Sequence, residues 1–428
     1  MSLHIACQLN RKVWNILAGT FFTRTALFMS VPYLSIFLTG QKHIPLLLTS
    51  LVLAINPLVN VTFSWLGGTL ADKLPLHKII GLTPLIWGTV FILFYFADSF
   101  WSFLLLNGLN GLCYSLFEPA SKKVLSTESL PEHRLLVFNL RYTAINLGCF
   151  AGPLLSLLFN MKMTMFPYVI LGTMYILYGI STKFFFRKAS AAAAPVHAKN
   201  ARSLQALSTI RKDHVYLLLV AGMSFSYFGY SQLNGTVSQF LANTNTLSDG
   251  TRLYSILLSV NAIVILTTQF AVLRRISAWN PFNVVILSNL LIGLSFLFFL
   301  FPASYLPLLL FIIVFSLGEL LIGARFDALV DELSSTENKG LYFGCAEIVK
   351  LGTISGPIVG GGLLGIFGFQ AGWPVFGFLS GLTIAGALLI RSAKLRHRRS
   401  VLSKATQDLA IAEQLDVQEA GDDARVLG

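Results

Sequence analysis

The stretch Gly148-Cys149-Phe150-Ala151-Gly152-Pro153 has the same glycine and proline spacing as Gly352-Thr353-Ile354-Ser355-Gly356-Pro357, which lies 204 residues later in a chain of 428 residues. Both copies lie within long apolar segments. Glycines four residues apart let two membrane helices approach closely, and the proline leaves one backbone carbonyl without its helical donor. Two copies at this offset predict a chain folded as two similar halves.

The composition predicts an integral membrane protein. Hydrophobic residues make up 55% of the chain and charged residues 12%, which is about half the charged fraction of a soluble domain. Apolar runs of about 20 residues recur along the chain and are continuous rather than alternating, which indicates helices and not a β-barrel. The fold class we predict is an all-α membrane protein.

Twelve apolar segments are long enough to cross a bilayer. We expect these spans at 14–38, 46–71, 78–97, 101–124, 136–160, 165–186, 215–243, 250–272, 281–300, 305–333, 341–368 and 371–393. The chain is then divided into an N-terminal tail (1–13), a six-helix half (14–186), a basic linker (187–214), a second six-helix half (215–393) and a C-terminal tail (394–428). Two pseudo-symmetric halves are typical of secondary transporters.

The basic residues indicate the orientation. If both termini face the cytoplasm, 24 of the 31 Lys and Arg residues lie on that side or at its helix ends, four lie within spans, and only Lys42, Lys162 and Arg252 lie outside. This asymmetry follows the positive-inside rule. We expect a multi-pass protein of the cell inner membrane, surrounded by lipid, with both termini cytoplasmic. The cytoplasmic bases then explain most of the net charge of +12 without a nucleic-acid partner.

The residues typical of enzymes, metal sites and ATP-driven pumps form no recognisable group. Cys113, Cys149 and Cys345 lie in apolar segments and Cys7 lies in the N-terminal tail, without a CxxC pair. The seven His residues lie in loops or tails, and no phosphate-binding loop is present. We expect no metal and no cofactor; a membrane enzyme or sensor is the alternative from a different class.

A motif after the second span resembles a signature of the major facilitator superfamily. The stretch Gly67-Gly68-Thr69-Leu70-Ala71-Asp72-Lys73-Leu74-Pro75-Leu76-His77-Lys78 is similar to the family's G-x-L-A-D-[RK]-x-G-[RK]-[RK] between helices 2 and 3. It departs from that pattern at Pro75 and Leu76. The resemblance covers residues 14–393 and implies a monomeric transporter of small molecules whose two halves give alternating access to a central site.

Two further motifs narrow the resemblance. The Gly148-x-x-x-Gly152-Pro153 stretch is similar to the family's helix 5 antiporter motif, which is associated with proton-driven drug exporters. Asn107 occupies the position of the family's helix 4 Arg, so the resemblance does not carry the proton-relay role of that Arg over to this chain. Arg24 and the Gly318-Glu319 pair resemble residues of bacterial multidrug and small-peptide exporters with twelve spans.

Ionisable side chains within the spans are candidates for function, because burying them in a bilayer is costly. Eight such residues are selected as candidates: Arg24, Glu118, Arg141, Glu319, Arg325, Asp327, Glu347 and Lys350. Arg24 and Glu319 lie near the midplane, and the resemblance places their helices around one central cavity. A carboxylate there can bind and release a proton as its hydration and its distance to a cation change. The interpretations are proton coupling or substrate contact by both residues, or a static ion pair.

Two further contacts are expected in the cytoplasmic part of the bundle. Glu118 and Arg141 lie at similar depth on consecutive spans, which predicts a structural or gating ion pair. The alternative is that Glu118 acts as a proton relay in place of the missing helix 4 Arg. The resemblance implies that Asp72, followed by Lys73, contacts the start of helix 11 and holds the halves together in the outward-facing carrier.

Four charges cluster near the cytoplasmic ends of spans 10 and 11: Arg325, Asp327, Glu347 and Lys350. Glu347 and Lys350 are three residues apart and can pair on one helix. The cluster is interpreted as a gate that breaks on opening or as a static network.

The seventh span is unusually polar between residues 224 and 235. Its two glycines and several hydroxyl groups indicate a helix that bends and lines an aqueous cavity, although helix packing is the alternative. The candidates for substrate contact in this span are Tyr227, Tyr230, Gln232 and Asn234. Weaker candidates in spans 4 and 5 are Asn110, Tyr114, Tyr142 and Asn146.

The GxxxGP motifs are expected to pack helices where the halves meet, helix 5 on helix 8 or helix 11 on helix 2. The interpretations are packing alone, or an interface that slides and seals during alternating access. Their residues are Gly148, Gly152, Pro153, Gly352, Gly356 and Pro357. The function we predict is proton-coupled export of a small amphiphilic compound. The alternatives are export of an endogenous metabolite, such as a siderophore or a small peptide, and an importing symporter.

Overall fold

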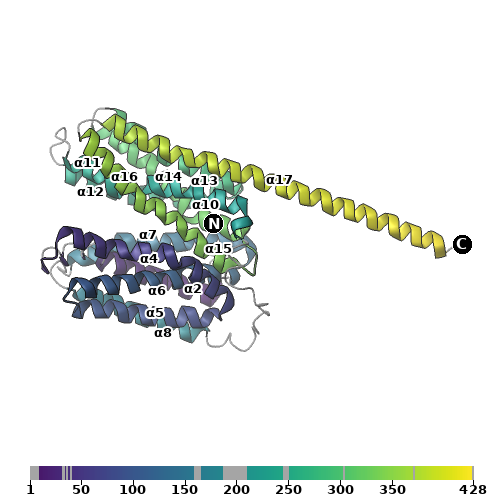
Figure 1. Cartoon of the computed structure of the whole chain (residues 1–428), viewed down its shortest axis with the longest axis horizontal. Helices are drawn as coiled ribbons and strands as arrows, with labels where there is room; N and C mark the ends of the chain where they lie inside the picture. The colour runs from purple at the N-terminus through teal and green to yellow at the C-terminus, as the bar shows by residue number, and fades with distance from the viewer. Residues whose placement is uncertain are drawn as a thin grey trace.

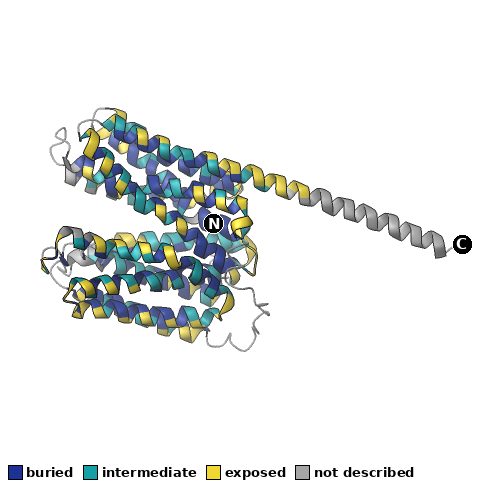
Figure 2. Ribbon diagram, viewed as in Figure 1, coloured by how far each residue is buried: buried dark blue, intermediate teal, exposed yellow. Residues whose placement is uncertain are grey.

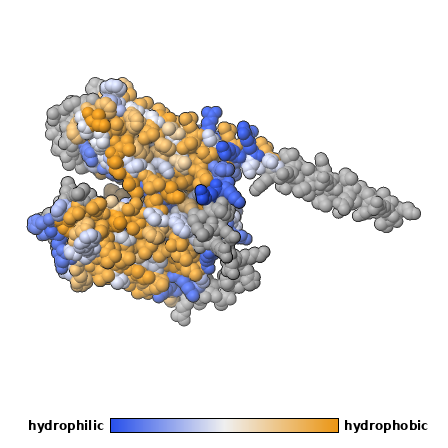
Figure 3. Space-filling view, viewed as in Figure 1, coloured by the Kyte–Doolittle hydropathy of each residue, from blue (hydrophilic) through white to orange (hydrophobic). Residues whose placement is uncertain are grey.

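A computed structural model describes residues 9–426 except 31–33, 35–36, 39–40, 159–164, 187–209, 244–249, 302–303 and 370–371. Within these residues the regular structure is helical and contains no strand, so the predicted all-α class is confirmed. The outer surface in view is largely apolar, with hydrophilic patches toward its two ends (Figure 3). This distribution suits a protein surrounded by lipid.

Two groups of helices follow one another along the chain (Figure 1). The N-terminal group comprises α2 (Arg11–Ser30), α4 (Leu46–Lys73), α5 (Leu76–Leu93), α6 (Phe100–Thr127), α7 (Arg134–Leu158) and α8 (Phe166–Phe186). The C-terminal group comprises α10 (His214–Ser231), α11 (Ser238–Asn243), α12 (Gly250–Ile276), α13 (Pro281–Ser295), α14 (Tyr305–Leu333), α15 (Lys339–Ala346), α16 (Lys350–Phe367) and α17 (Gly372–Val426).

Short irregular turns interrupt two of these helical paths. A π-helix at Leu233–Val237 joins α10 to α11 and overlaps the end of the polar stretch, residues 224–235, where the sequence predicts a bend. A 3-10 turn η8 (Glu347–Val349) joins α15 to α16. Both interruptions lie beside the polar residues described below, and such departures from α-helical geometry are common at functional sites.

Nine helices of the described chain are long and apolar enough to cross a membrane. They coincide with nine of the predicted spans. Helices α2, α7 and α10 coincide with the other three spans but do not meet the same length and hydropathy criteria. These three helices carry many amide, hydroxyl or charged side chains. Membrane crossing by all twelve segments therefore stays a prediction.

The two groups repeat one packing pattern. In the N-terminal half α2 packs on α7, α4 on α6, and α5 on α8. In the C-terminal half α10 packs on α16, α12 on α14, and α13 on α17. These are corresponding pairs when each half is counted as six helices, so the internal repeat suggested by the two GxxxGP motifs extends to the fold.

The glycines of both motifs permit close helix contacts within each half. A Cβ atom at Gly148 would lie 2.8 Å from the backbone nitrogen of Thr25, and one at Gly152 would lie 2.8 Å from that of Met29, both in α2. The second motif packs α16 on α10 in the same way, since Gly356 lies against the backbone of Phe228.

Our prediction that these motifs join the two halves was therefore wrong. The first motif packs helix 5 on helix 1, and the second packs helix 11 on helix 7. Pro357 continues the second contact by packing against Gly235 of the π-helix, where a Cβ would lie 2.9 Å away. Gly352 lies in the same interface, beside Ser224 and Phe228, and Pro153 lies in α7. The spacing predicts close contact but does not identify the partner helix.

The halves are joined at one end of the molecule. Buried residues continue from the N-terminal half through α15 into the C-terminal half (Figure 2). At the opposite end, the space-filling view shows a cleft between the halves (Figure 3). We call the end with α15 the latch side and the cleft end the open side. The Lys12–Glu128 ion pair, at the start of α2 and the end of α6, lies on the latch side.

Candidate coupling and substrate site

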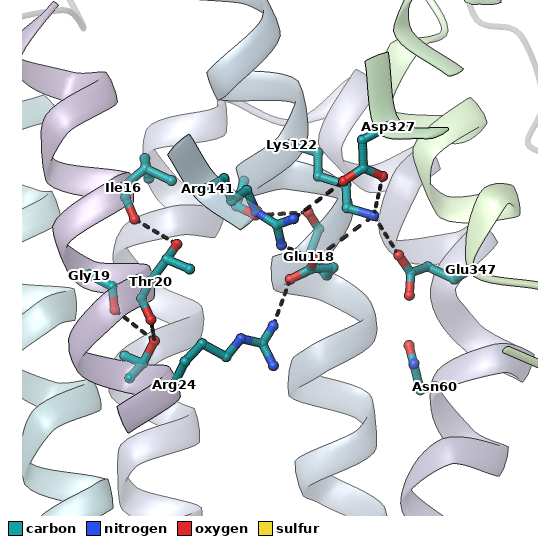
Figure 4. Close-up of polar contacts among 12 residues, drawn as sticks. Ile16, Gly19, Thr20, Arg24, Asn60, Glu118, Lys122, Arg141, Asp327 and Glu347 are labelled. Carbon is teal, nitrogen blue, oxygen red and sulfur yellow. Dashed lines mark hydrogen bonds and ion pairs between the residues drawn. The ribbon is translucent and has the colours of Figure 1, made fainter. Parts of the chain in front are cut away.

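A buried network of charged residues connects the halves (Figure 4). Arg141 of α7 contacts Glu118 of α6 and lies 3.4 Å from Asp327 of α14. Lys122, one turn beyond Glu118, lies 3.0 Å from Asp327 and 2.9 Å from Glu347. All five side chains are buried. Such buried pairs hold the two halves in one relative position, because separating the halves would leave each buried charge without its partner.

The edge of this network toward the open side is formed by two cations. Arg24 of α2 lies 3.4 Å from Glu118, and Lys350 of α16 lies 2.5 Å from Glu347. Both cations lie over the ring of Tyr114, at 5.5 Å for the Arg24 Cζ and 4.0 Å for the Lys350 Nζ. Among the described residues, this network contains four cations and three carboxylates.

Glu319 of α14 is separate from this network. It is buried, and its Oε2 accepts a hydrogen bond of 2.8 Å from the Nδ2 of Asn261 in α12. Asn261 Nδ2 also lies 3.0 Å from Ser316 Oγ. Among the described residues no cation lies within ion-pair distance of Glu319. The static Arg24–Glu319 pair considered from the sequence is therefore absent, because Arg24 pairs with Glu118 instead.

Asp72 joins the halves on the latch side. It accepts hydrogen bonds of 2.8 Å from the backbone N–H groups of both Gly340 and Leu341, at the N-terminus of α15. Lys123 approaches the same carboxylate to 2.5 Å. Anions are favoured at a helix N-terminus by its exposed donors and by the helix dipole. The contact implied by the family resemblance is present; Lys73, which follows Asp72, ends α4.

A second latch-side cluster was not anticipated from the sequence. Asp331 of α14 pairs with Lys339 at the start of α15 and lies 3.3 Å from Arg134 at the start of α7. Ser126 donates to Asp331 and accepts from Lys339 at 2.8 Å. From the sequence, Arg134 and Lys339 are bases of the expected cytoplasmic loops, and no pattern indicates that they share a partner.

The predicted cluster of Arg325, Asp327, Glu347 and Lys350 is divided in the structure. Asp327, Glu347 and Lys350 belong to the central network. Arg325 instead donates to the backbone oxygen of Trp279, at 3.1 Å, after the end of α12. Residues two apart on a helix point in different directions, which explains why Arg325 does not follow Asp327.

The polar residues of the seventh span differ in their surroundings. Tyr227 and Tyr230 are partly buried and pack near Phe326 and Phe315 of α14, respectively. Gln232 is buried between α10 and α16 and donates to the Phe228 oxygen at 3.2 Å, which is a packing role.

Asn234, in the π-helix, is exposed and accepts a hydrogen bond of 2.8 Å from the Tyr254 hydroxyl. Asn110 is buried between α5 and α6, where it accepts from Trp87 at 2.7 Å. Tyr142 packs on Gly323 across the interface of the halves, and its buried hydroxyl has no hydrogen-bond partner among the described residues. Asn146 donates to the Tyr142 oxygen at 3.0 Å.

A small cavity beside Arg24 is lined by side chains from α2, α5, α6, α7 and α8 of the N-terminal half. It has room for roughly one water molecule, so it cannot by itself hold an amphiphilic compound. No group of three or more His, Cys, Asp and Glu residues in the described ranges forms a metal site.

The comparisons with known proteins place this architecture in one family. The family model of the Major Facilitator Superfamily matches residues 16–350. The uncharacterized MFS-type transporter YqjV of Bacillus subtilis is 36% identical over 375 residues, which cover 87% of this chain and 91% of that protein. A Na(+), Li(+), K(+)/H(+) antiporter of Planococcus maritimus is 24% identical over 82% of this chain and 88% of its own length.

A solved structure has the same fold. The human organic anion transporter MFSD10 superposes with a TM-score of 0.68 at 19% identity, covering 89% of this chain and 99% of that one. At this identity the likeness concerns the fold alone. Together with the family match, the two repeated halves and the buried network between them identify this chain as a membrane transporter of the Major Facilitator Superfamily.

Proposed function

We propose that this transporter exports a small amphiphilic compound in exchange for protons. The observation that carries the proposal is Glu319, a buried carboxylate without a cation in ion-pair contact among the described residues. A lone charge at the centre of a membrane protein costs several kcal/mol. A proton can neutralise it, so this position is suited to bind and release a proton during the transport cycle.

The surroundings of Glu319 favour coupling to movement of the halves. Tyr142 and Cys149 of α7 and Tyr230 of α10 lie near Glu319. Two of these residues belong to the opposite half. Sliding of α7 against α14 would therefore change the environment of the carboxylate and its proton affinity.

The latch contacts support a cycle of alternating access. In our proposal the latch side is cytoplasmic, as the positive-inside rule predicts, so the described conformation faces outward. Breaking the Asp72 and Asp331 contacts would open the cytoplasmic side, while the open side closes. Export rather than import is favoured by the helix 5 GxxxGP motif and its resemblance to that of proton-driven exporters.

The test is transport by purified protein in proteoliposomes under an imposed pH gradient. A panel of dyes, dipeptides and siderophores distinguishes a foreign amphiphile from an endogenous metabolite. Glu319→Gln should abolish gradient-driven movement while binding persists. The matched control is Glu332→Gln, an exposed glutamate at the end of the same helix. Transport that ignores the gradient, or survives in Glu319→Gln, refutes coupling through Glu319.

A second candidate function is exchange of a monovalent cation for protons. The relative from Planococcus maritimus carries this activity in its name, and oxygens of Glu319 and Ser316 both lie within 3.0 Å of the Nδ2 of Asn261. The cationic excess of the central network opposes entry of a metal ion. In the same vesicles, a proton flux elicited by Na⁺, Li⁺ or K⁺ without any organic compound would favour this second function.

A further inference from the structure

We propose that Arg24, Lys350 and the ring of Tyr114 bind an anionic group of the transported compound. This inference rests on the proposed export function and names the class of compound that is exported. The three residues come from α2, α16 and α6, so the site contains parts of both halves. Both cations lie over one aromatic ring, at 5.5 Å and 4.0 Å.

The helix directions place this site toward the open side. Helix α6 runs to the latch side, where Ser126 contacts Lys339, so Tyr114 lies about one turn nearer the open side than Glu118. Helix α16 runs the opposite way, so Lys350 lies about one turn nearer the open side than Glu347. A compound entering from the cleft therefore first meets the end of the network that is formed by Arg24, Tyr114 and Lys350.

Accessibility differs between the cations at this edge and the carboxylates behind them. The Lys350 side chain is 27% exposed and that of Arg24 is 16% exposed. The side chains of Glu118 and Glu347 are 6% and 4% exposed. The surface presented to the cleft is consequently cationic.

The charge balance supports an anionic ligand. Lys122, Arg141, Arg24 and Lys350 face three carboxylates, so this network retains one positive charge. Glu319 does not compensate it by contact, since its described partner is Asn261. A carboxylate, sulfonate or phosphate of a ligand would neutralise the excess, and cationic side chains in a partly dehydrated site bind such groups through charge-assisted hydrogen bonds.

The neighbouring aromatic residues suit the remainder of the compound. The ring centroids of Tyr227 and Tyr230 lie 6.4 Å apart, and those of Tyr227 and Phe326 lie 6.2 Å apart. An aromatic body attached to the anionic group could pack on these rings. The ligand class is therefore an aromatic or otherwise apolar monoanion.

The experiment measures binding without any gradient, using protein in phosphatidylcholine nanodiscs and isothermal titration calorimetry. The probes are 1-naphthoate, neutral 1-naphthylmethanol and cationic 1-naphthylmethylamine, which share one ring system. We expect 1-naphthoate to bind at least about tenfold more tightly than the other two, which corresponds to about 1.4 kcal/mol. Lys350→Gln should remove this preference and Lys350→Arg should keep it. Lys394→Gln, at the exposed start of the tail, should leave it unchanged.

The inference is overturned if 1-naphthoate shows no saturable binding, binds no better than the neutral probe, or keeps its advantage in Lys350→Gln. It is also overturned if added phosphatidylglycerol displaces the probe, because the site would then belong to a lipid headgroup. If Lys350→Gln does not fold, the inference is tested instead with Tyr114→Leu and with the three-probe comparison on the unaltered protein. Glu319→Gln should retain anion binding. Failure of proton coupling therefore does not refute anion binding at this site, and failure of anion binding does not refute proton coupling through Glu319.

Discussion

Lys122 of the N-terminal half and Glu347 of the C-terminal half form a buried ion pair across the transporter, with 2.9 Å between Nζ and Oε1. The same amine lies 3.0 Å from Asp327. One side chain of α6 thus holds two carboxylates of the opposite half. Since an ion that loses its partner in a buried site keeps its desolvation cost, this residue should be sensitive to replacement.

Replacing Lys122 by Gln should destabilise the described conformation by about 3–5 kcal/mol, because Asp327 and Glu347 lose their shared cation. The measurement is the thermal unfolding midpoint in nanodiscs. The matched control is Lys42→Gln, which removes an ion pair with Asp98, a residue whose side chain is 82% exposed. Exposed pairs contribute about 0–1 kcal/mol. Equal losses in the two variants would contradict the importance of the buried network.

Neutralising Asp72 should loosen the latch side. Asp72→Asn weakens the contacts with the α15 backbone at Gly340 and Leu341, and α15 carries Cys345, which is buried. In a background whose other three cysteines are replaced by Ser, maleimide labelling of Cys345 should accelerate several-fold. Asp98→Asn is the control, because Asp98 is exposed and pairs with Lys42, away from the latch. Unchanged labelling would show that the latch does not depend on the carboxylate.

The pairing of Glu118 with Arg141 could be predicted because similar depth on consecutive helices brings charges together. The pairing of Glu347 with Lys350 could likewise be predicted, from their spacing of three residues, and it is confirmed. The contacts of Lys122 with Asp327 and Glu347 could not be predicted, because Lys122 lies near the expected end of its span, where a basic residue is typical of the membrane interface. Depth along a helix is encoded in sequence position, whereas the direction in which a side chain points depends on the rotation and tilt of each helix. Arg24 consequently pairs with Glu118 and not with Glu319.

Two glycines of α16 differ in how closely they are packed, so replacing each of them distinguishes the effect of close packing from the effect of losing any glycine in the helix. A Cβ at Gly352 would lie 2.8 Å from the backbone nitrogen of Phe228, whereas one at Gly362 meets nothing within 4 Å. Gly352→Ala should lower stability by about 1–3 kcal/mol through overpacking. Gly362→Ala should cause no loss, since Ala favours a helix. Thermal unfolding of both variants checks this; a similar fall in both midpoints would argue against α10–α16 packing as the cause.

Asp331 and Lys339 should be energetically coupled, because they form a buried pair that also contacts Ser126. Asp331→Asn and Lys339→Gln should each destabilise the latched state, and the double variant should lose less than the sum of the two. A double-mutant cycle on unfolding midpoints measures this difference, for which we expect about 0.5–3 kcal/mol. Pairing Asp331→Asn with Lys42→Gln supplies the control cycle and should give additive changes, because Lys42 lies away from the latch. Additivity in both cycles would mean that Asp331 stabilises the protein independently of Lys339, through Arg134 or Ser126 alone.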